Sequence, residues 1–260
     1  MEVIISKDKN AANAAAAEFT ANAVRENPRI VLGLATGETP LGLYAILAEM
    51  CAQKTVSFSK ATAFNLDEYA GVAKTDPHSY AYYMRENFFD RIDIDAANTF
   101  IPDGTADNLS FACAAYERAI KNAGGIELQV LGIGGDGHIG FNEPTSSLAS
   151  RTRMKTLTRR TISDNARFFG GDENAVPPHV LTMGIGTIME ADTIVMLAFG
   201  ENKADAVAKM VEGPITSMVP ASVLQMHPKV KVFLDEPSAS KLNLADYYKW
   251  VYSRKPHPEA

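Results

Sequence analysis

The sequence predicts an α/β fold with a doubly wound, mostly parallel sheet and helices on both of its faces. The first observation behind this prediction is that short apolar, strand-like runs alternate with stretches of helical spacing, the pattern of strands linked by crossover helices. The second is size: 260 residues, 46% of them hydrophobic, are enough to bury a sizeable core. No Pro/Ser-rich linker, repeat or low-complexity tract marks a boundary, so we expect a single domain over residues 1–260.

Local composition predicts each element. The expected strands, all short apolar runs, are residues 3–6, 29–34, 62–66, 127–133, 193–199 and 230–234. The expected helices, which are Ala-rich or have apolar residues at helical spacing, are residues 8–26, 40–53, 78–91, 109–122, 202–211 and 242–252. Ligands of such sheets bind beyond the carboxyl ends of the strands, so polar motifs that follow a strand are the candidates for a site.

Composition and charge argue against several classes of protein. The formal net charge of −6 disfavours nonspecific attraction to nucleic acid. With only Cys51 and Cys113, a disulfide framework or a thiolate zinc site is improbable. No apolar run approaches the roughly 18 residues of a membrane span, and the first residues do not read as a signal peptide. We expect a soluble, cytoplasmic protein without a membrane or nucleic-acid partner.

Asp136, His138 and Glu143 lie in a glycine-rich segment, residues 131–144, after the expected central strand. Four of the seven residues from Gly134 to Gly140 are glycines, which lets the backbone turn tightly and approach a ligand. A carboxylate that accepts from one imidazole nitrogen leaves the other free to move protons. An ordinary glycine-rich turn is the alternative. The residue types would also suit a metal, but a lone histidine without a second ligand cluster leads us to expect none.

A second motif, residues 33–40, joins an expected strand to a helix. Pro40 suits the first helical position, which would make Thr39 the N-cap. The approach to the helix is formed by Thr36, Gly37 and Glu38. Backbone amides and the helix dipole favour a phosphate here, although the motif is neither a P-loop nor a dinucleotide fingerprint. An ordinary strand-to-helix turn is the alternative.

Asp67 and Glu68 follow the third expected strand. Adjacent side chains of an extended segment point in opposite directions, so we expect Asp67 to enter a pocket and Glu68 to pack or cap elsewhere. A solvated acidic turn is the alternative. Two cations are further candidates: Arg167, and Lys203 at the start of a helix, where a lysine is unfavourable unless it binds an anion or swings away.

Taken together, these motifs resemble the glucosamine-6-phosphate deaminase (glucosamine-6-phosphate isomerase) family. The resemblance covers residues 33–40, 65–71, 132–144, 150–153, 167–169, 177–186 and 224–228. The wider superfamily includes the 6-phosphogluconolactonases, which share the Rossmann-like fold and a glycine-rich Asp-Gly-His loop. The continuation Phe141-Asn-Glu-Pro144 is similar to the deaminase branch.

The resemblance implies conversion of D-glucosamine 6-phosphate and water to D-fructose 6-phosphate and ammonia, in amino-sugar catabolism and without a cofactor. His138 would move a proton from the C1 hydroxyl toward the ring oxygen, with Asp136 and Glu143 orienting it. Asp67 would then take the C2 proton of the open-chain sugar. The positions that match the family's phosphate site are Thr36, Gly37, Glu38, Thr39, Arg167 and Lys203.

Residues 146–190 resemble the family's mobile lid over the pocket. Glu38 departs from the family pattern, because many relatives have Ser or Gly there. Since a carboxylate repels phosphate, we expect the Glu38 side chain to face away.

Some members of the family are hexamers activated by N-acetylglucosamine 6-phosphate, and others are monomers. Residues matching the effector site of the hexamers are Ser146, Ser147, Arg153 and Lys155. Lys249 stands where that group has an aromatic residue. We expect a homo-oligomer, with a hexamer favoured and a monomer as the alternative. Two alternative functions stay open: a sugar-phosphate lactonase, which needs no C2 base, and a catalytically silent sensor.

Overall fold

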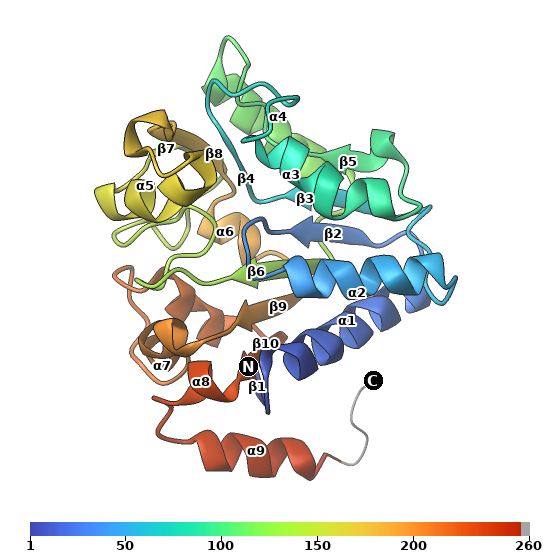
Figure 1. The fold of residues 1–260 in the computed structure, drawn as a ribbon, viewed down its shortest axis with the longest axis vertical. Coiled ribbons are helices and arrows are strands. Elements are labelled where there is room, and N and C mark those ends of the chain that lie inside the picture. The colour runs from blue at the N-terminus through green and yellow to red at the C-terminus, as the bar shows by residue number, and fades with distance from the viewer. Residues whose placement is uncertain (256–260) are drawn as a thin grey trace.

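The central sheet of the computed structural model, which describes residues 1–255, has seven strands within that range. All its neighbouring strands pair in parallel, in the order β1–β10–β9–β6–β2–β3–β5 (Figure 1). They are β1 (Glu2–Ser6), β2 (Val31–Leu34), β3 (Thr62–Asn65), β5 (Thr99–Phe100), β6 (Leu128–Gly132), β9 (Thr193–Ala198) and β10 (Val230–Asp235). The predicted mostly parallel sheet is confirmed.

The switch point of the sheet lies between β2 and β6. These strands are neighbours, but the chain continues from β2 to β3 on one side and from β6 to β9 on the other. Two sequence motifs, residues 33–40 and 131–144, follow these strands. The topology therefore brings both motifs to the crevice where ligands of such sheets bind.

Helices cover both faces, as the doubly wound prediction requires. The α-helices are α1 (Lys9–Glu26), α2 (Leu41–Ala52), α3 (Tyr80–Asn87), α4 (Leu109–Asn122), α5 (Arg159–Asn165), α6 (Ile185–Ile188), α7 (Ala204–Val211), α8 (Glu236–Ala239) and α9 (Ala245–Ser253). The short 3₁₀ helices are η1 (Phe89–Arg91), η2 (Ala96–Asn98), η3 (Ala166–Phe169), η4 (Glu173–Ala175), η5 (Glu201–Lys203) and η6 (Pro220–Met226). Figure 1 shows α1 and α2 side by side across one face of the sheet.

Two apolar clusters hold these layers together. Val130 of β6 packs with α1 and α2 on one face, whereas the next residue, Leu131, packs with α4, α6 and α7 on the other. Successive residues of a strand point to opposite faces of the sheet. Because helices cover both faces, both side chains are fully buried. In α1 the face toward the sheet is made of small residues such as Ala16 and Ala17, which let the helix lie close to the strands.

Several element boundaries differ from the prediction. Helix α2 begins at Leu41, and Pro40 is its N-cap residue, without a side-chain capping bond; the predicted Thr39 cap is therefore wrong. The helix expected over residues 78–91 ends at Asn87, because the backbone of Phe88 leaves the helical region and only a 3₁₀ turn follows. The last helix starts at Ala245 rather than residue 242.

A second, antiparallel sheet was not predicted. It pairs β4 (Asp67–Tyr69) with β8 (His179–Thr182), and β8 with β7 (Arg153–Thr156). Strand β7 reads Arg-Met-Lys-Thr and alternates between partly buried and exposed positions, which gives little apolar signal. In Figure 1 this sheet and α5 lie on the side toward which the arrowheads of β2 and β6 point. Among the residues described here, no helix is long and apolar enough to cross a bilayer.

Candidate active site

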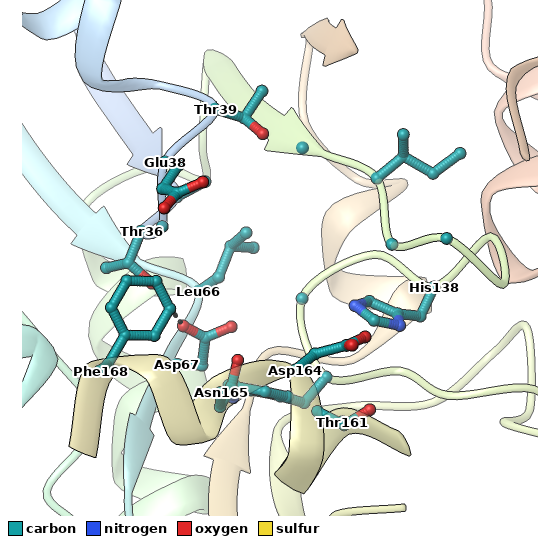
Figure 2. Close-up of a pocket in the computed structure, with 18 of the residues that line it drawn as sticks. Thr36, Glu38, Thr39, Leu66, Asp67, His138, Thr161, Asp164, Asn165 and Phe168 are labelled. Carbon is teal, nitrogen blue, oxygen red and sulfur yellow. Dashed lines mark hydrogen bonds between the residues drawn. The ribbon is translucent and has the colours of Figure 1, made fainter. Parts of the chain in front are cut away.

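A pocket of about 360 Å³ opens at the carboxyl ends of β2, β3 and β6 (Figure 2). Its lining combines the motifs after these strands with part of the segment 146–190. The predicted phosphate residues all line it: Thr36, Gly37, Glu38, Thr39, Arg167 and Lys203. Asp67 and His138 face the same space from different elements. The prediction that separate motifs form one pocket is confirmed.

Asp67 is buried at the pocket wall, where β4 starts. The hydroxyl of Thr36 donates to Oδ1 of Asp67 at 3.5 Å. Burial, and next the charge of Glu68, raise the pKa of Asp67 to about 7. A carboxyl group that titrates near neutral pH is suited to take and return a proton.

Glu68 points the other way, as predicted for its neighbour in an extended segment. Its carboxylate accepts hydrogen bonds from the backbone amides of Tyr80 and Ala81, each at 2.9 Å, at the start of α3. This side chain therefore caps a helix, while Asp67 faces the pocket.

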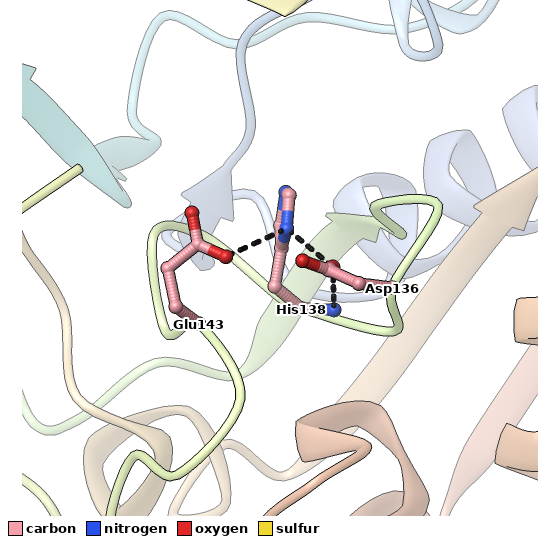
Figure 3. A group of neighbouring side chains, drawn as sticks. All are labelled: Asp136, His138 and Glu143. Atoms are coloured by element: carbon pink, nitrogen blue, oxygen red, sulfur yellow. Dashed lines mark hydrogen bonds and ion pairs between the residues drawn. The ribbon is translucent and has the colours of Figure 1, made fainter. Parts of the chain in front are cut away.

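His138 stands between two carboxylates (Figure 3). Its Nδ1 lies 2.7 Å from Oδ1 of Asp136 and 3.5 Å from Oε2 of Glu143. Burial lowers the pKa of His138, but the hydrogen bonds and charges of Asp136 and Glu143 outweigh it and raise the pKa to about 9. Burial also opposes the ionisation of Asp136, yet His138 holds the pKa of that carboxyl well below its usual range. Neither carboxylate lines the pocket itself; both stand behind the imidazole.

The glycines after β6 allow this arrangement. A Cβ on Gly134 would lie 2.2 Å from Cε1 of His138, so the imidazole rests directly on the glycine backbone. Gly137 has a φ of +89°, a conformation that favours glycine. The turn is closed by the Gly134 amide, which donates to the His138 carbonyl at 2.9 Å.

Two tyrosines hold the backbone of the segment between β2 and α2. The Tyr44 hydroxyl donates to the Ala35 carbonyl at 2.6 Å, and the Tyr83 hydroxyl donates to the Gly37 carbonyl at 2.5 Å. Gly37 has a φ of +90°. With its carbonyls held by the tyrosines, the loop has its amides available for an anion.

The cationic candidates reach the pocket from two short helices. Arg167 lies in η3, within the segment 146–190, and Lys203 ends η5 and is the N-cap residue of α7. Burial is the main cause that lowers the pKa of Lys203; the charges of Arg167 and Arg160 add to it, whereas those of Asp164 and Asp136 oppose it. A partly buried ammonium whose pKa is lowered in this way is a site that an anion would stabilise.

The expectation that Glu38 faces away is wrong. Its Oε2 accepts a hydrogen bond from Nη1 of Arg167 at 3.1 Å. The carboxylate therefore lies against a cation that lines the pocket.

Sequence reasoning missed part of the lining. These residues include Tyr80 from α3, Arg160, Asp164 and Asn165 from α5, Phe168 from η3, and Asn202 from η5. The segment 146–190 was not divided into helices and strands from the sequence. Its Thr-Arg-Arg-Thr run carried a usable signal, because Thr158 caps α5 by accepting from the Thr161 amide at 3.2 Å.

The effector candidates lie elsewhere. Ser146, Ser147, Arg153 and Lys155 are absent from the lining of this pocket. Arg153 and Lys155 are on β7, and Arg153 donates to Oδ1 of Asn142 at 2.9 Å. Lys249 is on α9 and pairs with Glu236 at 2.8 Å. Figure 1 shows α9 at the opposite end of the molecule from β7, so one chain does not unite these residues.

Known proteins have similar sequences and the same fold. A glucosamine-6-phosphate deaminase from Cutibacterium acnes (strain DSM 16379 / KPA171202) is 52% identical over 255 residues, or 98% of this chain and 97% of the relative. One from Hahella chejuensis (strain KCTC 2396) is 54% identical, covering 97% of this chain and 96% of the relative. A solved monomeric glucosamine-6-phosphate deaminase has a TM-score of 0.90 and 44% identity, covering 93% of this chain and all of that one.

The fold extends to more distant structures. The 6-phosphogluconolactonase from Thermotoga maritima shares it with a TM-score of 0.69 at 19% identity, over 90% of this chain and 97% of that one. The profile of the glucosamine-6-phosphate isomerases/6-phosphogluconolactonase family matches residues 6–233. The chain belongs to this family of glucosamine-6-phosphate isomerases and 6-phosphogluconolactonases.

Proposed function

We propose that this enzyme converts D-glucosamine 6-phosphate and water to D-fructose 6-phosphate and ammonia. The observation that carries the proposal is the pairing of two proton-transfer groups in one pocket. Asp67 is a buried carboxyl with a pKa of about 7, and His138 is an imidazole backed by two carboxylates. The similarity to deaminases over nearly the whole chain supports the same reaction.

The phosphate binds first in this scheme. The amides of the loop Thr36–Gly37–Glu38–Thr39 and the cations Arg167 and Lys203 are the groups that recognise the dianion. Anchoring the phosphate fixes the sugar ring between Asp67 and His138, and positioning of this kind lowers the entropic part of the barrier.

His138 assists ring opening. Its Nδ1 is held by Asp136, which leaves Nε2 to give its proton to the ring oxygen and then take the proton of the C1 hydroxyl. Asp136 and Glu143 stabilise the imidazolium that is present before and after these two transfers. The product of this step is the open-chain aldehyde.

Asp67 then carries out the isomerisation. Its carboxylate removes the C2 proton of the aldehyde while O1 takes a proton from the imidazolium of His138, giving an enolamine, and the protonated Asp67 then returns its proton to C1. The resulting C2 iminium is attacked by water, and the carbinolamine collapses to the ketone and ammonia. A general base of this type contributes roughly 10²–10⁴ in rate. Each step is a proton transfer, an addition or an elimination, so the scheme needs neither a metal nor an organic cofactor.

The decisive assay follows ammonia and fructose 6-phosphate released from glucosamine 6-phosphate. Equal amounts of both products, with turnover lowered at least a hundredfold in Asp67→Asn, are expected. Hydrolysis of 6-phosphogluconolactone without dependence on Asp67 would favour a lactonase instead. Binding of the amino sugar without turnover would favour a sensor.

Residues 146–190 act as a mobile lid in this proposal. The support is that Arg167, a phosphate ligand, lies on a segment that includes β7, α5 and β8 outside the parallel sheet. Faster amide exchange in this segment than in β6 and β9, slowed by inorganic phosphate, is the expected result. Equal exchange in both regions would exclude a lid.

We also propose a homo-oligomer in the cytoplasm, with a hexamer favoured. The support is the match of Ser146, Ser147, Arg153 and Lys155 to the effector pattern of hexameric relatives. A monomer is the alternative, and one solved relative is monomeric. The mass measured by light scattering, with and without N-acetylglucosamine 6-phosphate, distinguishes them.

A further inference from the structure

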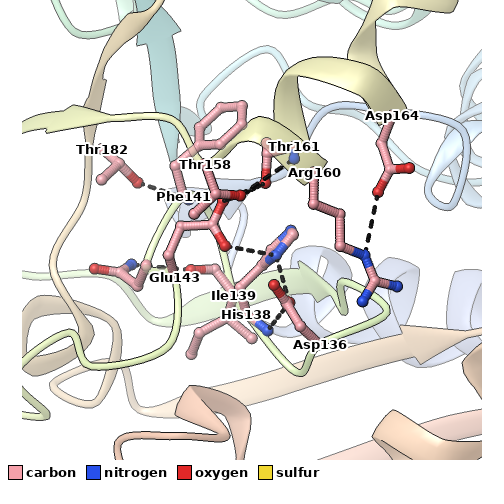
Figure 4. A network of polar contacts seen from close by, with 11 residues as sticks. Asp136, His138, Ile139, Phe141, Glu143, Thr158, Arg160, Thr161, Asp164 and Thr182 are labelled. Carbon is pink, nitrogen blue, oxygen red and sulfur yellow. Dashed lines mark hydrogen bonds and ion pairs between the residues drawn. The ribbon is translucent and has the colours of Figure 1, made fainter.

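The carboxylate of Glu143 contacts two hydroxyls at the start of α5. The residue is 3% exposed. Oε1 accepts a hydrogen bond from the hydroxyl of Thr161, and the hydroxyl of Thr158 lies 3.5 Å from the same oxygen (Figure 4). The two hydroxyls are 3.0 Å apart. Both threonines belong to the start of α5, in the segment 146–190, whereas Glu143 belongs to the loop after β6.

The other oxygen of the carboxylate faces the imidazole. Oε2 of Glu143 lies 3.5 Å from Nδ1 of His138. One carboxylate therefore joins α5 to the group that moves protons at the sugar ring. A buried carboxylate that loses a hydrogen-bond donor is destabilised and turns toward whatever partner or water it can reach.

We propose that Thr161 is a positioning residue for the deaminase reaction: its hydroxyl holds Glu143 in the orientation that keeps Oε2 against His138. This inference rests on the proposed function. Thr161 is 4% exposed, so water does not readily replace its hydroxyl as a donor. Thr158 has a different main task, because its hydroxyl accepts from the Thr161 amide and caps α5.

The charged groups that face His138 are Asp136 and Glu143 from its own loop and, more distantly, Asp67 from β4. Asp136 is in contact with Nδ1 at 2.7 Å without help from Thr161. Loss of the Thr161 hydroxyl therefore removes one of two supports. The imidazolium becomes less stable, and its pKa falls below about 9 while staying above that of a histidine without any carboxylate.

The test compares Thr161→Val, which keeps the shape and removes the hydroxyl, with Thr161→Ser, which keeps the hydroxyl. Ser163→Ala is the matched control, since Ser163 lies on the exposed side of the same helix. The first readout is the NMR titration of the His138 ring protons, assigned by their absence in His138→Gln. The second is kcat for glucosamine 6-phosphate as a function of pH.

In Thr161→Val the His138 titration is expected to move to lower pH by roughly 0.5 or more. A fall in kcat of roughly 10- to 100-fold is expected from loss of a hydrogen bond to a charged group, with little change in KM. Thr161→Ser should restore both values to near those of the unchanged protein. Ser163→Ala should match the unchanged protein in both the His138 titration and kcat.

An unchanged His138 titration in a folded Thr161→Val protein, judged by its thermal melt, would overturn the inference. Equal defects in the Val and Ser variants would also overturn it, because the hydroxyl would then be irrelevant. If Thr161→Val does not fold, Thr161→Cys, with a weak donor, takes its place and should fall between Ser and the expected Val result. A wild-type enzyme without turnover would disprove the proposed function, whereas the titration would still decide the role of Thr161.

Discussion

Arg167 and Glu38 form an ion pair across the mouth of the pocket, with Nη1 and Oε2 3.1 Å apart. Arg167 comes from η3 in the segment 146–190, and Glu38 comes from the loop that precedes α2. Both side chains are more than half exposed. The guanidinium proposed to bind the substrate phosphate is thus already paired with a carboxylate of the same chain.

Replacing Glu38 by Gln is expected to lower KM for the sugar phosphate. The phosphate no longer has to displace a carboxylate from Arg167, nor to lie beside a like charge. An exposed ion pair contributes roughly 0.2–1 kcal/mol, so a change of about 1.5- to 5-fold is expected in 50 mM salt. Steady-state kinetics at several salt concentrations measure it, and the advantage should shrink as salt screens the charges.

Glu173→Gln is the control for Glu38→Gln. Glu173 is an exposed acid in the same segment as Arg167 but does not line the pocket. Glu173→Gln changes the net charge by the same amount as Glu38→Gln. If both variants lower KM equally, the effect belongs to overall charge and not to the Arg167 pair.

The activity should have an acid limb near pH 7. Burial and the Glu68 charge raise the pKa of Asp67 to about 7, and the base must be ionised to take the C2 proton. Below that pH, kcat/KM, which reports the ionisation of the free enzyme, should fall about tenfold per pH unit. A sugar phosphate itself titrates near pH 6, so a second acid limb near that pH belongs to the substrate. A profile that stays flat down to pH 5 would contradict Asp67 as the base.

Asp67→Asn should make the protein more stable at pH 8 although it removes the base. The folded-state pKa of Asp67, about 7, lies above the ordinary value of 3.8 for this carboxyl, so the folded state binds more protons than the unfolded state between these two pH values. Stability is therefore lost as pH rises toward 7. Asn cannot ionise, and a gain on the order of 1–4 kcal/mol in the free energy of unfolding is expected at pH 8. Urea unfolding should show the gain shrink toward pH 5.

Much of the fold could be predicted because the sheet is buried on both faces. The run that forms β6 is apolar throughout except for Gln129, and α4 has the predicted bounds, Leu109–Asn122. Strand β5 was not predicted, because it has only two residues, Thr99 and Phe100, that pair with β3. The sheet of β4, β7 and β8 was not predicted because its strands have only three or four residues each, too few to show a clear periodic pattern.

The site was predictable where the backbone requires a residue type. Position 134 requires a glycine, because the ring of His138 occupies the space where a Cβ would lie. The Glu38–Arg167 pair was not predictable, because 129 positions separate its members and only the folded chain shows their distance. The contact of Thr161 with Glu143 was not predictable either, because α5 had not been recognised from the sequence.

Activity should survive removal of metals. The ligand-type atoms of Asp136, His138 and Glu143 lie within 4.8 Å of one another, so a metal effect is a fair test of the scheme. Nδ1 of His138 already has an ion-pair contact with Asp136 at 2.7 Å, and Thr161 already donates to Glu143, so these side chains have partners without a metal. Dialysis against EDTA and assay in chelated buffer are expected to leave kcat within about twofold. Loss of activity that Zn²⁺ or Mn²⁺ restores would require a metal in the mechanism.

Gly134→Ala should disturb His138 without replacing any ionisable residue. The added methyl would lie 2.2 Å from Cε1 of the ring, so either the imidazole or the loop must move. Overpacking of this kind costs roughly 1–3 kcal/mol. A ring displaced from Asp136 also loses the contact that raises its pKa to about 9. We expect a lower melting temperature, a lower kcat and a His138 titration at lower pH.

Gly132→Ala is the natural comparison for Gly134→Ala. The methyl at position 132 would meet the side chain of Thr39 at 3.6 Å, an ordinary van der Waals contact, so the imidazole stays in place. In Gly132→Ala the titration of His138 should equal that of the unchanged protein, whatever happens to substrate binding. If the two alanine variants shift the titration equally, the ring does not depend on the space above Gly134, and loop flexibility explains the glycines instead.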